Sequence, residues 1–318
     1  CISSAASDVY KRQGKDESEK STTKIPPLMW AFTLVLAVGS GVGGYIIGER
    51  EGQQNAVDQI AEQIGADGTD RAGGAGAAGD GSGEAEEPQV KEVPDNVEPG
   101  TDFSPAKKQD NGYYDATIHG PGSPVTSPEE IANTARRDPA DPMSQGALDA
   151  PVVIAEFTDW ECPYCIRHAA ETEQELIDEY VDAGLVRIEW NDMPTQGPNS
   201  VAAAKAGRAA AEQGKFTEYK KAYMAEAAER GGHPGFTIDD YVRFAGTAGV
   251  PDLAKFREDA ESDKYDEALE KSLEYAQELG ITGTPGFVVN TEFIGGALPV
   301  QEFRYVINGE LKKVADKN

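Results

Sequence analysis

One pair of cysteines constrains this chain more than any other feature of its sequence. The motif Cys162-Pro163-Tyr164-Cys165 follows an apolar run over 152–157 and precedes a segment with helical apolar spacing. The motif therefore lies at a turn from a strand into a helix, where unpaired backbone N–H groups and the helix dipole favour negative charge. Such a position lowers the pKa of a thiol and makes its thiolate reactive at neutral pH. We interpret the motif as a redox site.

The order of residues within the motif indicates different tasks for the two cysteines. Cys162 stands at the start of the helix, and Pro163 suits the first helical position because its missing N–H costs nothing there. Cys165 follows within about one helical turn, close enough to form a small disulfide with Cys162 and to resolve a mixed disulfide. We therefore expect a dithiol–disulfide pair that exchanges with other thiols.

The composition favours one folded domain with tethering segments over a disulfide-stapled scaffold. The chain has 318 residues but three cysteines, so no further disulfide can form within the folded part. Its formal net charge of -27 argues against a nucleic-acid partner. The third cysteine, Cys1, opens a chain that lacks an initiator Met. Either the sequence is trimmed there, or Cys1 is a lipidated N-terminus.

An uncharged, apolar segment near the N-terminus predicts a transmembrane anchor helix over 28–48. Its length matches the roughly 30 Å core of a bilayer. A cleaved signal peptide is the alternative, although the apolar run is long for one. Residues 1–27 form a polar, disordered tail with several lysines, whereas acidic residues follow the span. The positive-inside rule therefore places the tail in the cytoplasm and the C-terminal bulk outside it. We expect a single-pass plasma-membrane protein of a bacterial cell envelope.

Small residues on the second half of this segment offer a face for helix packing. Gly39 and Gly43 are four positions apart, as are Gly44 and Gly48. This spacing lets membrane helices approach closely, so the face is a candidate contact to a membrane protein complex. The alternative is that glycine is simply common in membrane helices.

The segment after the predicted anchor has the composition of a tether. Residues 49–112 are rich in Gly, Ala, Asp and Glu and have almost no aromatic residues. Such a sequence cannot bury enough apolar area to offset the entropy of ordering it. We expect a flexible acidic linker over 49–112 and a folded domain over 113–318.

Alternating strands and helices are predicted within 113–318. The expected strands cover 152–158, 185–190, 286–290 and 292–294. The first of them is apolar on both faces, which is typical of a central strand covered on both sides. A helical insertion of three or four helices fills about 200–279, with breaks at Gly231-Gly232, at Gly249 and near Ser262, and a helix over 299–314 closes the chain. This order predicts an α/β thioredoxin fold with a helical insertion.

A glutamate within the central strand is the second residue that we expect to carry chemistry. Glu156 lies in the middle of the apolar run, where a buried carboxylate is costly unless it is used. Burial raises the pKa of a carboxyl, which lets Glu156 exchange a proton with the inner thiol of Cys165 during disulfide exchange. The alternative is a glutamate at a strand end that reaches water.

The run before the last strand pair contains a second marker. Gly283-Thr284-Pro285 directly precedes the strand that starts at 286, where a proline removes a ladder donor and marks a bend. A cis peptide between Thr284 and Pro285 would present the Thr284 backbone beside the cysteines, free to pair with an extended substrate. Composition alone favours trans, since cis is the minority state of X-Pro bonds.

Together these motifs resemble those of the DsbA-like thiol–disulfide oxidoreductases of the thioredoxin superfamily, over about 140–310. The shared motifs, in the family's order and spacing, are Asp149-Ala150-Pro151-Val152, the run from Glu156 to Cys165, and Gly283-Thr284-Pro285. The resemblance implies that Cys162 is the exposed nucleophile and Cys165 the buried resolving thiol. It also implies that Glu156 is the buried acid, and that Pro285 is cis and faces the disulfide.

One position departs from the family's pattern. Strongly oxidising members often carry His between the cysteines, where its charge and hydrogen bonding stabilise the thiolate; here the residue is Tyr164. Asp159 and Glu161 add negative charge nearby, which opposes thiolate formation. We therefore expect a less oxidising couple than in the strongest family members, though a more oxidising one than cytosolic thioredoxin.

Other interpretations of the candidate residues are weaker. A zinc site needs four ligands, and one Cys pair with His168 does not supply them, so we expect no metal. We expect His119, His168 and His233 to be surface residues without a role. Trp160 either contacts the substrate beside the site or serves in packing.

These patterns predict a membrane-anchored, extracytoplasmic thiol–disulfide oxidoreductase that forms disulfides in exported proteins. Its redox group is the Cys162–Cys165 disulfide, and no dissociable cofactor is expected. The residues expected to bind or support the substrate are Pro163, Tyr164, Thr284, Pro285 and Trp160. An oxidase of this kind needs a membrane partner that reoxidises it, whereas a reductase or isomerase needs a reductant. A further alternative is an accessory subunit of a membrane complex with a secondary redox role.

Overall fold

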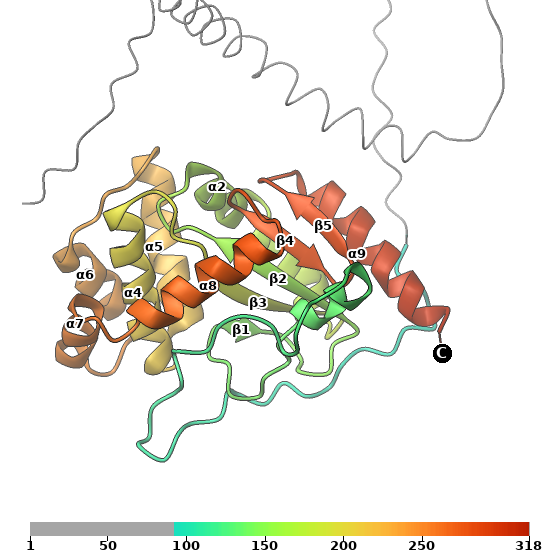
Figure 1. Ribbon diagram of the computed structural model, residues 1–318, viewed down its shortest axis with the longest axis horizontal. Helices are drawn as coiled ribbons and strands as arrows, with labels where there is room; N and C mark the ends of the chain where they lie inside the picture. The colour runs from blue at the N-terminus through green and yellow to red at the C-terminus, as the bar shows by residue number, and fades with distance from the viewer. Residues whose placement is uncertain (1–91, 318) are drawn as a thin grey trace, which may run out of the picture. The chain divides into compact units, whose positions relative to one another are not determined.

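Five strands of the described chain form one mixed β-sheet, around which the helices are arranged (Figure 1). The computed structural model describes residues 92–317. The strands are β1 (Ser144–Gln145), β2 (Val152–Thr158), β3 (Val186–Asp192), β4 (Gly286–Val289) and β5 (Glu292–Gly295). Their order is β1-β3-β2-β4-β5, with β2 parallel to β3 and antiparallel to β4. Strand β2 is thus central and buried along its whole length, as its unbroken apolar sequence predicts.

Helices connect the strands and form a separate group in the middle of the chain. Those between β2 and β3 are α2 (Pro163–Glu171), α3 (Glu173–Leu176) and the π-helical η2 (Ile177–Val181). The insertion contains α4 (Pro198–Glu212), α5 (Phe216–Arg230), α6 (Ile238–Ala248), α7 (Leu253–Glu261) and α8 (Asp266–Glu278). The remaining two are the 3-10 helix η1 (Pro128–Thr134) and the closing α9 (Val300–Ala315). Figure 1 shows α4 to α7 grouped at one side of the sheet and α8 crossing its strands.

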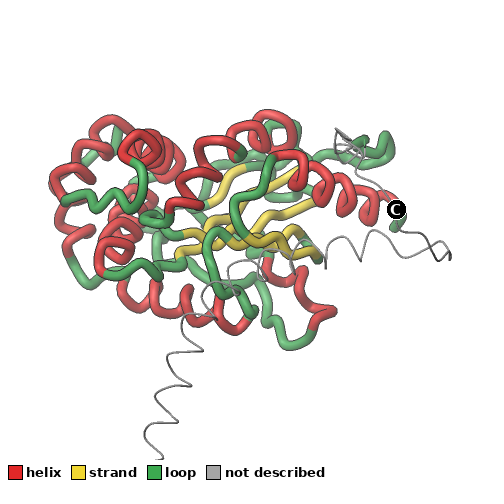
Figure 2. Tube along the Cα trace, turned by 90° about the horizontal axis from the view of Figure 1, so that it is seen from above, coloured by secondary structure: helices red, strands yellow, loops and turns green. Residues whose placement is uncertain are grey.

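The two faces of β2 pack in different parts of the core, because successive side chains of a strand point to opposite faces. Ile154 belongs to the larger apolar cluster, which includes Phe303 of α9. Phe157 belongs to the smaller one, where its ring lies 5.8 Å from that of Tyr275 on α8. Helices accordingly lie on both sides of the strands (Figure 2). By this alternation, Glu156 faces the side of α2 and α9, which is the side of the cysteines.

The thioredoxin fold with a helical insertion is confirmed, but the insertion has five helices in place of three or four. The predicted breaks at Gly231, Gly249 and Ser262 end α5, α6 and α7. The unpredicted break separates α4 from α5 at Gly214, whose φ of 71° is left-handed. A Cβ on Gly214 would lie 2.5 Å from the Tyr114 ring, so only glycine fits this turn.

The folded unit also includes part of the segment that composition assigns to the linker over 49–112. Val97 is buried, and the Gly100 backbone N–H donates to the Gly184 carbonyl at 2.9 Å. The Asp149 carboxylate accepts hydrogen bonds from the backbone N–H groups of Thr101 and Asp102, both at 2.9 Å. Backbone hydrogen bonds of this kind do not depend on apolar side chains, so composition does not reveal them.

The tail over 1–27, the anchor over 28–48 and the glycine face at Gly39, Gly43, Gly44 and Gly48 lie outside the described residues. Within the described part of the chain, no helix has the length and apolarity needed to cross a bilayer.

Candidate redox-active site

The cysteine motif lies at the start of α2, directly after the central strand. Cys162 is the N-cap residue of α2 with extended backbone, and Pro163 takes the first helical position, as expected. Cys165 follows within the first turn. Both are free thiols in this structure and both are buried, Cys162 at 4% exposure and Cys165 at 1%. The expectation of an exposed Cys162 therefore holds only in comparison with Cys165.

The loop before β4 covers the outer cysteine. The peptide bond between Thr284 and Pro285 is cis, as the family resemblance implies. The Cys162 thiol donates a hydrogen bond to the Thr284 carbonyl, with 3.3 Å between Sγ and oxygen. This carbonyl lies beside the sulfur that a substrate thiol must reach, so Thr284 and Pro285 lie where substrate contact is predicted.

The surroundings of Cys162 favour its thiolate. Hydrogen bonds lower the pKa of Cys162 to about 5, against the opposing effect of burial. The largest effect comes from the Cys165 thiol, followed by the Thr284 side chain and the backbone N–H groups of Cys165 and Tyr164. The backbone donors among them lie at the open N-terminal end of α2. Together these hydrogen bonds supply the stabilisation that a histidine gives other members of the family, so Tyr164 does not prevent a reactive thiolate.

The inner cysteine has the opposite environment. Burial raises the pKa of Cys165 well above its usual value, and the neighbouring Cys162 sulfur adds to the effect. The Asp159 backbone N–H donates to the Cys165 sulfur at 3.4 Å. Cys165 therefore stays a neutral thiol when Cys162 is ionised.

Glu156 lies on the same side of the sheet, deep in the core. It is 2% exposed, so the alternative of a strand-end glutamate that reaches water is wrong. Burial raises the pKa of Glu156 to about 7, while Lys220 lowers it and Glu173 raises it. A carboxyl with this pKa can hold or release a proton near neutral pH, which suits exchange with Cys165.

Three residues that the sequence analysis did not assign to the site complete a buried polar cluster around Glu156. His168 on α2 places Nε2 3.9 Å from a Glu156 oxygen. The Lys220 ammonium, on α5, forms an ion pair with the Glu173 carboxylate at the start of α3. We refer to Glu156, His168, Glu173 and Lys220 as the inner polar cluster.

The prediction that His168 is a surface residue is wrong. It is 2% exposed and packs between the rings of Phe287 and Phe303, whose centroids lie 4.7 and 5.1 Å from its own. Burial lowers the pKa of His168 to about 4, so the ring is neutral at pH 7. His168 follows the inner cysteine, Cys165, by three positions, a spacing that places both on the same face of a helix, so helical periodicity carries this signal in principle.

The inner polar cluster also has the donors of a metal site. Ligand atoms of Glu156, His168 and Glu173 all lie within 4.8 Å of one another. However, the Lys220 ammonium already provides a cation to Glu173. We therefore treat the cluster as a proton-transfer and charge-balancing group.

The acidic residues before the motif are held by hydrogen bonds. The Asp159 carboxylate accepts from the Thr195 backbone N–H at 2.7 Å and from the Ser200 hydroxyl at 2.7 Å. The Glu161 carboxylate accepts from the Tyr223 hydroxyl at 3.0 Å and from the Gly235 N–H at 2.9 Å. These donors balance charge that the sequence analysis expects to oppose the Cys162 thiolate.

Trp160 has a packing role in this structure. It is 1% exposed, and its indole N–H donates to the Asp192 carboxylate at 3.2 Å. Its ring meets Tyr223 edge-on, with 5.0 Å between centroids. Helix α4 approaches so closely at Gly207 that a Cβ there would lie 2.4 Å from the Trp160 ring. Trp160 thus supports the segment before Cys162 from within the core.

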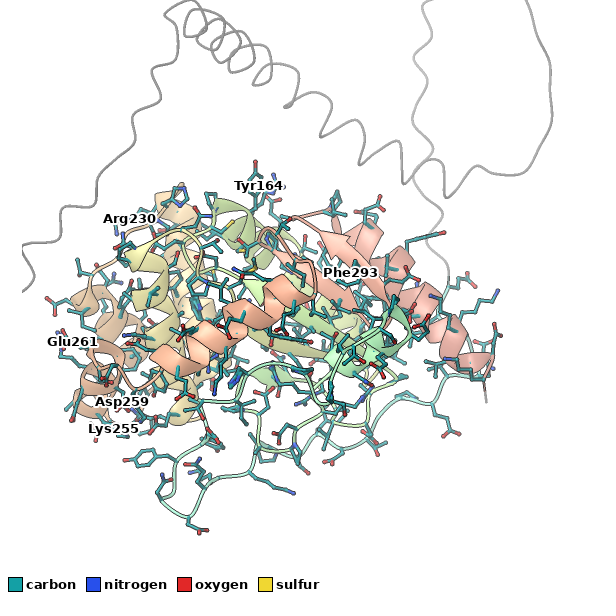
Figure 3. The ribbon with its side chains drawn as sticks, viewed as in Figure 1. Tyr164, Arg230, Lys255, Asp259, Glu261 and Phe293 are labelled. Carbon is teal, nitrogen blue, oxygen red and sulfur yellow. The ribbon has the colours of Figure 1, made fainter. Side chains whose placement is uncertain are left out.

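Tyr164 is the large apolar side chain that the motif presents to solvent. It is 57% exposed, with the Arg167 guanidinium 5.1 Å from its ring centroid. Figure 3 shows it projecting outward beside α2. An exposed aromatic ring within the motif is well placed for contact with a substrate, which remains a prediction.

Comparison with known proteins agrees with this geometry. The sequence profile of the family described as thioredoxin matches residues 139–309, which is more than half of the chain. The chain belongs to the thioredoxin family. The profile of the DsbA N-terminal domain matches residues 66–134, and the protein is DsbA-like within the thioredoxin family. As such it is a thiol–disulfide oxidoreductase.

The curated proteins to which the chain is similar include a disulfide bond formation protein and an antiporter. The probable disulfide bond formation protein D of Bacillus cereus is 29% identical over 179 residues, which cover 54% of this chain and 79% of that protein. The Na(+)/H(+) antiporter NhaA 3 of Salinispora tropica is 33% identical over 155 residues, which cover 48% of this chain but only 22% of the antiporter. The chain thus matches only a small part of the antiporter's length.

A solved structure has the same fold. Oxidised BdbD from Bacillus subtilis superimposes with a TM-score of 0.50 at 22% sequence identity, over 54% of this chain and 92% of that chain. At this identity the likeness establishes the thioredoxin fold of the described domain and no more.

Proposed function

We propose that this DsbA-like protein forms disulfides in exported proteins while anchored in the plasma membrane of a bacterial cell, with its thioredoxin domain outside the cytoplasm. The observation that carries the proposal is the contrast between the two thiols. The pKa of Cys162 is lowered to about 5, while that of Cys165 is raised. A stabilised Cys162 thiolate favours the reduced enzyme, and a couple whose reduced form is stabilised is an oxidant.

The reaction starts from the Cys162–Cys165 disulfide. A substrate thiolate attacks the Cys162 sulfur, the disulfide breaks, and its electron pair leaves on Cys165. The Cys165 thiolate then takes the proton of the neutral Glu156 carboxyl. A second substrate thiolate attacks the substrate sulfur of the mixed disulfide and releases Cys162 as a thiolate. The substrate has lost two electrons, and a membrane partner must accept them from the dithiol in turn.

The location rests on the N-terminal sequence. An apolar segment over 28–48 follows a lysine-bearing tail and precedes acidic residues. The folded domain has no cysteine besides the reactive pair. An oxidising compartment would therefore form no other disulfide within it, which is compatible with a location outside the cytoplasm. The relative named disulfide bond formation protein D supports the same direction of reaction.

The direct test uses the full chain in detergent micelles, oxidised and mixed with a reduced, unfolded ribonuclease. We expect transfer of disulfides to the ribonuclease, and none from C162S. Failure of the wild-type protein to transfer a disulfide would refute the oxidase. A redox potential near that of thioredoxin would favour the reductase or isomerase instead.

A second candidate function is supported by the antiporter relative. A domain similar to this one forms part of a membrane transport protein in Salinispora tropica. This chain is accordingly a candidate accessory subunit, with the glycine face at Gly39, Gly43, Gly44 and Gly48 as its contact. Replacing these glycines by Leu would then abolish function in cells, whereas C162S would not. The oxidase predicts the reverse.

A further inference from the structure

A loop of the helical insertion contacts the segment that leads into the cysteine motif, and its histidine has no part in the reaction described above. The loop follows α5 and has the sequence Gly231-Gly232-His233-Pro234-Gly235. Figure 3 shows Arg230, the last residue of α5, and Tyr164 of the motif along the same edge of the molecule. The loop therefore lies on the side of the molecule at which the motif reaches the surface.

Glu161, the residue before Cys162, holds this loop in place. Its carboxylate accepts hydrogen bonds from the Gly235 backbone N–H at 2.9 Å and from the Tyr223 hydroxyl at 3.0 Å. Gly232 and Gly235 have left-handed φ values of 62° and 57°, a conformation that favours glycine. The turn is thus shaped by its glycines and fixed by the residue adjacent to Cys162.

The His233 ring is oriented by the same residue. Its Nδ1 lies 2.9 Å from the backbone carbonyl oxygen of Glu161. A carbonyl only accepts, so Nδ1 carries the hydrogen of this bond and the neutral ring has its lone pair on Nε2. His233 is exposed, and Nε2 has no hydrogen-bond or ion-pair partner among residues 92–317. The ring therefore offers a basic nitrogen at the surface, next to the segment that leads into Cys162.

The first step of the oxidase reaction needs a group that removes a proton. The species that attacks a disulfide is a thiolate, yet an ordinary cysteine, with a pKa of about 8.5, is mostly protonated at pH 7. Glu156, Asp159 and Glu161 lie near the motif but are all buried. Glu156 moreover gives its own proton to Cys165 in this step. The proton of an incoming thiol must therefore pass to a group at the surface.

We propose that His233 is a catalytic base that takes the proton of the substrate thiol as its sulfur attacks Cys162. The inference rests on the oxidase function proposed above and deepens it. The S–H bond of the substrate breaks, its proton moves to Nε2, and the electron pair forms the bond to the Cys162 sulfur. The Cys162–Cys165 bond breaks, and its electron pair leaves on Cys165. The imidazolium of His233 then gives its proton to water. A base that a third group orients is a recurrent arrangement for activating a nucleophile, and the Glu161 carbonyl is that group here.

The test compares two small thiols in single-turnover reactions of the oxidised, full-length protein in detergent micelles at pH 8. Trifluoroethanethiol is mostly ionised at this pH, whereas 2-mercaptoethanol is mostly protonated. Loss of the Cys162–Cys165 disulfide is followed by acid quenching, alkylation and mass spectrometry. His233→Asn keeps an N–H for the Glu161 carbonyl but cannot take up a proton. H233N should slow the reaction with 2-mercaptoethanol at least about tenfold and the reaction with trifluoroethanethiol less than about twofold.

A second histidine serves as the matched control. The Nδ1 of His119 also lies close to a backbone carbonyl oxygen, that of Thr117 at 2.8 Å. However, His119 lines a cavity whose walls come from residues 115–138, away from the motif in the sequence. H119N should leave both rates unchanged. If H233N does not fold, H233Q replaces it and should show the same dependence on the thiol.

The outcomes separate this inference from the proposed function. A wild-type protein that neither thiol reduces refutes the oxidase itself. An active wild-type protein refutes the catalytic role of His233 alone if the histidine variant slows both thiols equally or neither of them. The same thiol-dependent loss in H119N would also refute it.

Discussion

Cys162 and Cys165 lie within one helical turn, yet the surroundings of these two free thiols differ. On the outer side, Cys162 meets hydrogen-bond donors at the open end of α2 and the carbonyl of Thr284. On the inner side, Cys165 is buried in the core, and its sulfur accepts a hydrogen bond from the Asp159 backbone N–H. The pKa of the first thiol is lowered, and that of the second is raised.

This contrast shows how two cysteines three positions apart come to have different tasks. Cys162 leaves the mixed disulfide as a thiolate, whereas Cys165 takes up a proton. The outer sulfur gains most from the hydrogen bond of the Cys165 thiol, and less from the Thr284 side chain and from backbone N–H groups in the first turn of the helix. Burial raises the pKa of the inner sulfur, which therefore takes up a proton as soon as the disulfide breaks. The chemistry of the site thus depends on hydrogen-bond donors around Cys162 and on the exclusion of water from Cys165.

The largest effect should come from removing the outer sulfur. C162S should reduce disulfide transfer to the uncatalysed background, because serine offers no nucleophile of comparable reactivity. C165S has no internal disulfide to transfer, but its Cys162 thiolate should attack oxidised glutathione, release one glutathione thiolate, and remain as a mixed disulfide at Cys162 that is visible by mass spectrometry under non-reducing conditions. If C165S turned over normally, the division of tasks between the two sulfurs would be wrong.

Changing the acid on the inner side should have the next largest effect. E156Q keeps the shape of Glu156 but cannot give a proton to Cys165, so we expect single-turnover exchange to slow about a hundredfold. Glu171→Gln, at an exposed position on the same helix as the cysteines, serves as the control and should leave the rate unchanged. An unaltered rate in E156Q would remove Glu156 from the mechanism.

The same variant should change stability with pH. The pKa of Glu156 rises from 4.5 to about 7 on folding, so the folded chain holds this proton more tightly than the unfolded chain. Its contribution to stability is therefore greatest below pH 4.5, falls as the pH rises to about 7, and is constant above. E156Q should gain up to roughly 3 kcal/mol over wild type across that window, measured by urea unfolding of the reduced proteins. A gain independent of pH would contradict the assignment.

A smaller effect is expected where the outer side is held in place. G207A puts a Cβ 2.4 Å from the Trp160 ring, so the ring and the segment before Cys162 must shift. We expect a loss of about 1–2 kcal/mol in unfolding free energy, since overpacking outweighs the better helix propensity of Ala. Gly309 on α9 has no heavy atom within 4 Å of its Cβ position, so G309A should stabilise by about 0.5–1 kcal/mol. Equal effects of the two variants would show that the contact with Trp160 is unimportant.

The outer side of the site was predictable from sequence because its signals are local. The motif at Cys162, the proline at 163 and the bend at Thr284-Pro285 each stand next to a strand or helix boundary that apolar patterning reveals. Likewise, the central strand and its buried Glu156 follow from one unbroken apolar run. The fold class could be predicted for the same reason, since its strands and helices alternate in a recognisable order.

The inner polar cluster was not predictable, because its members are brought together only by tertiary packing. Lys220 lies in a helix with little amphipathic pattern, and Glu173 stands among several acidic residues of similar spacing. Nothing in the sequence indicates that these two side chains meet behind Cys165. The packing of Gly207 on Trp160 is hidden in the same way, since a glycine within an Ala-rich helix has no local signature.

The contrast between the two thiols is tested most directly by titrating them in the reduced, full-length protein. Alkylation rates of Cys162 and Cys165, followed by mass spectrometry of each peptide from pH 3 to 10, report each thiolate separately. We predict a midpoint at about pH 5 for Cys162 and no ionisation of Cys165 up to pH 9. Two thiols that both titrate near pH 9 would contradict the account.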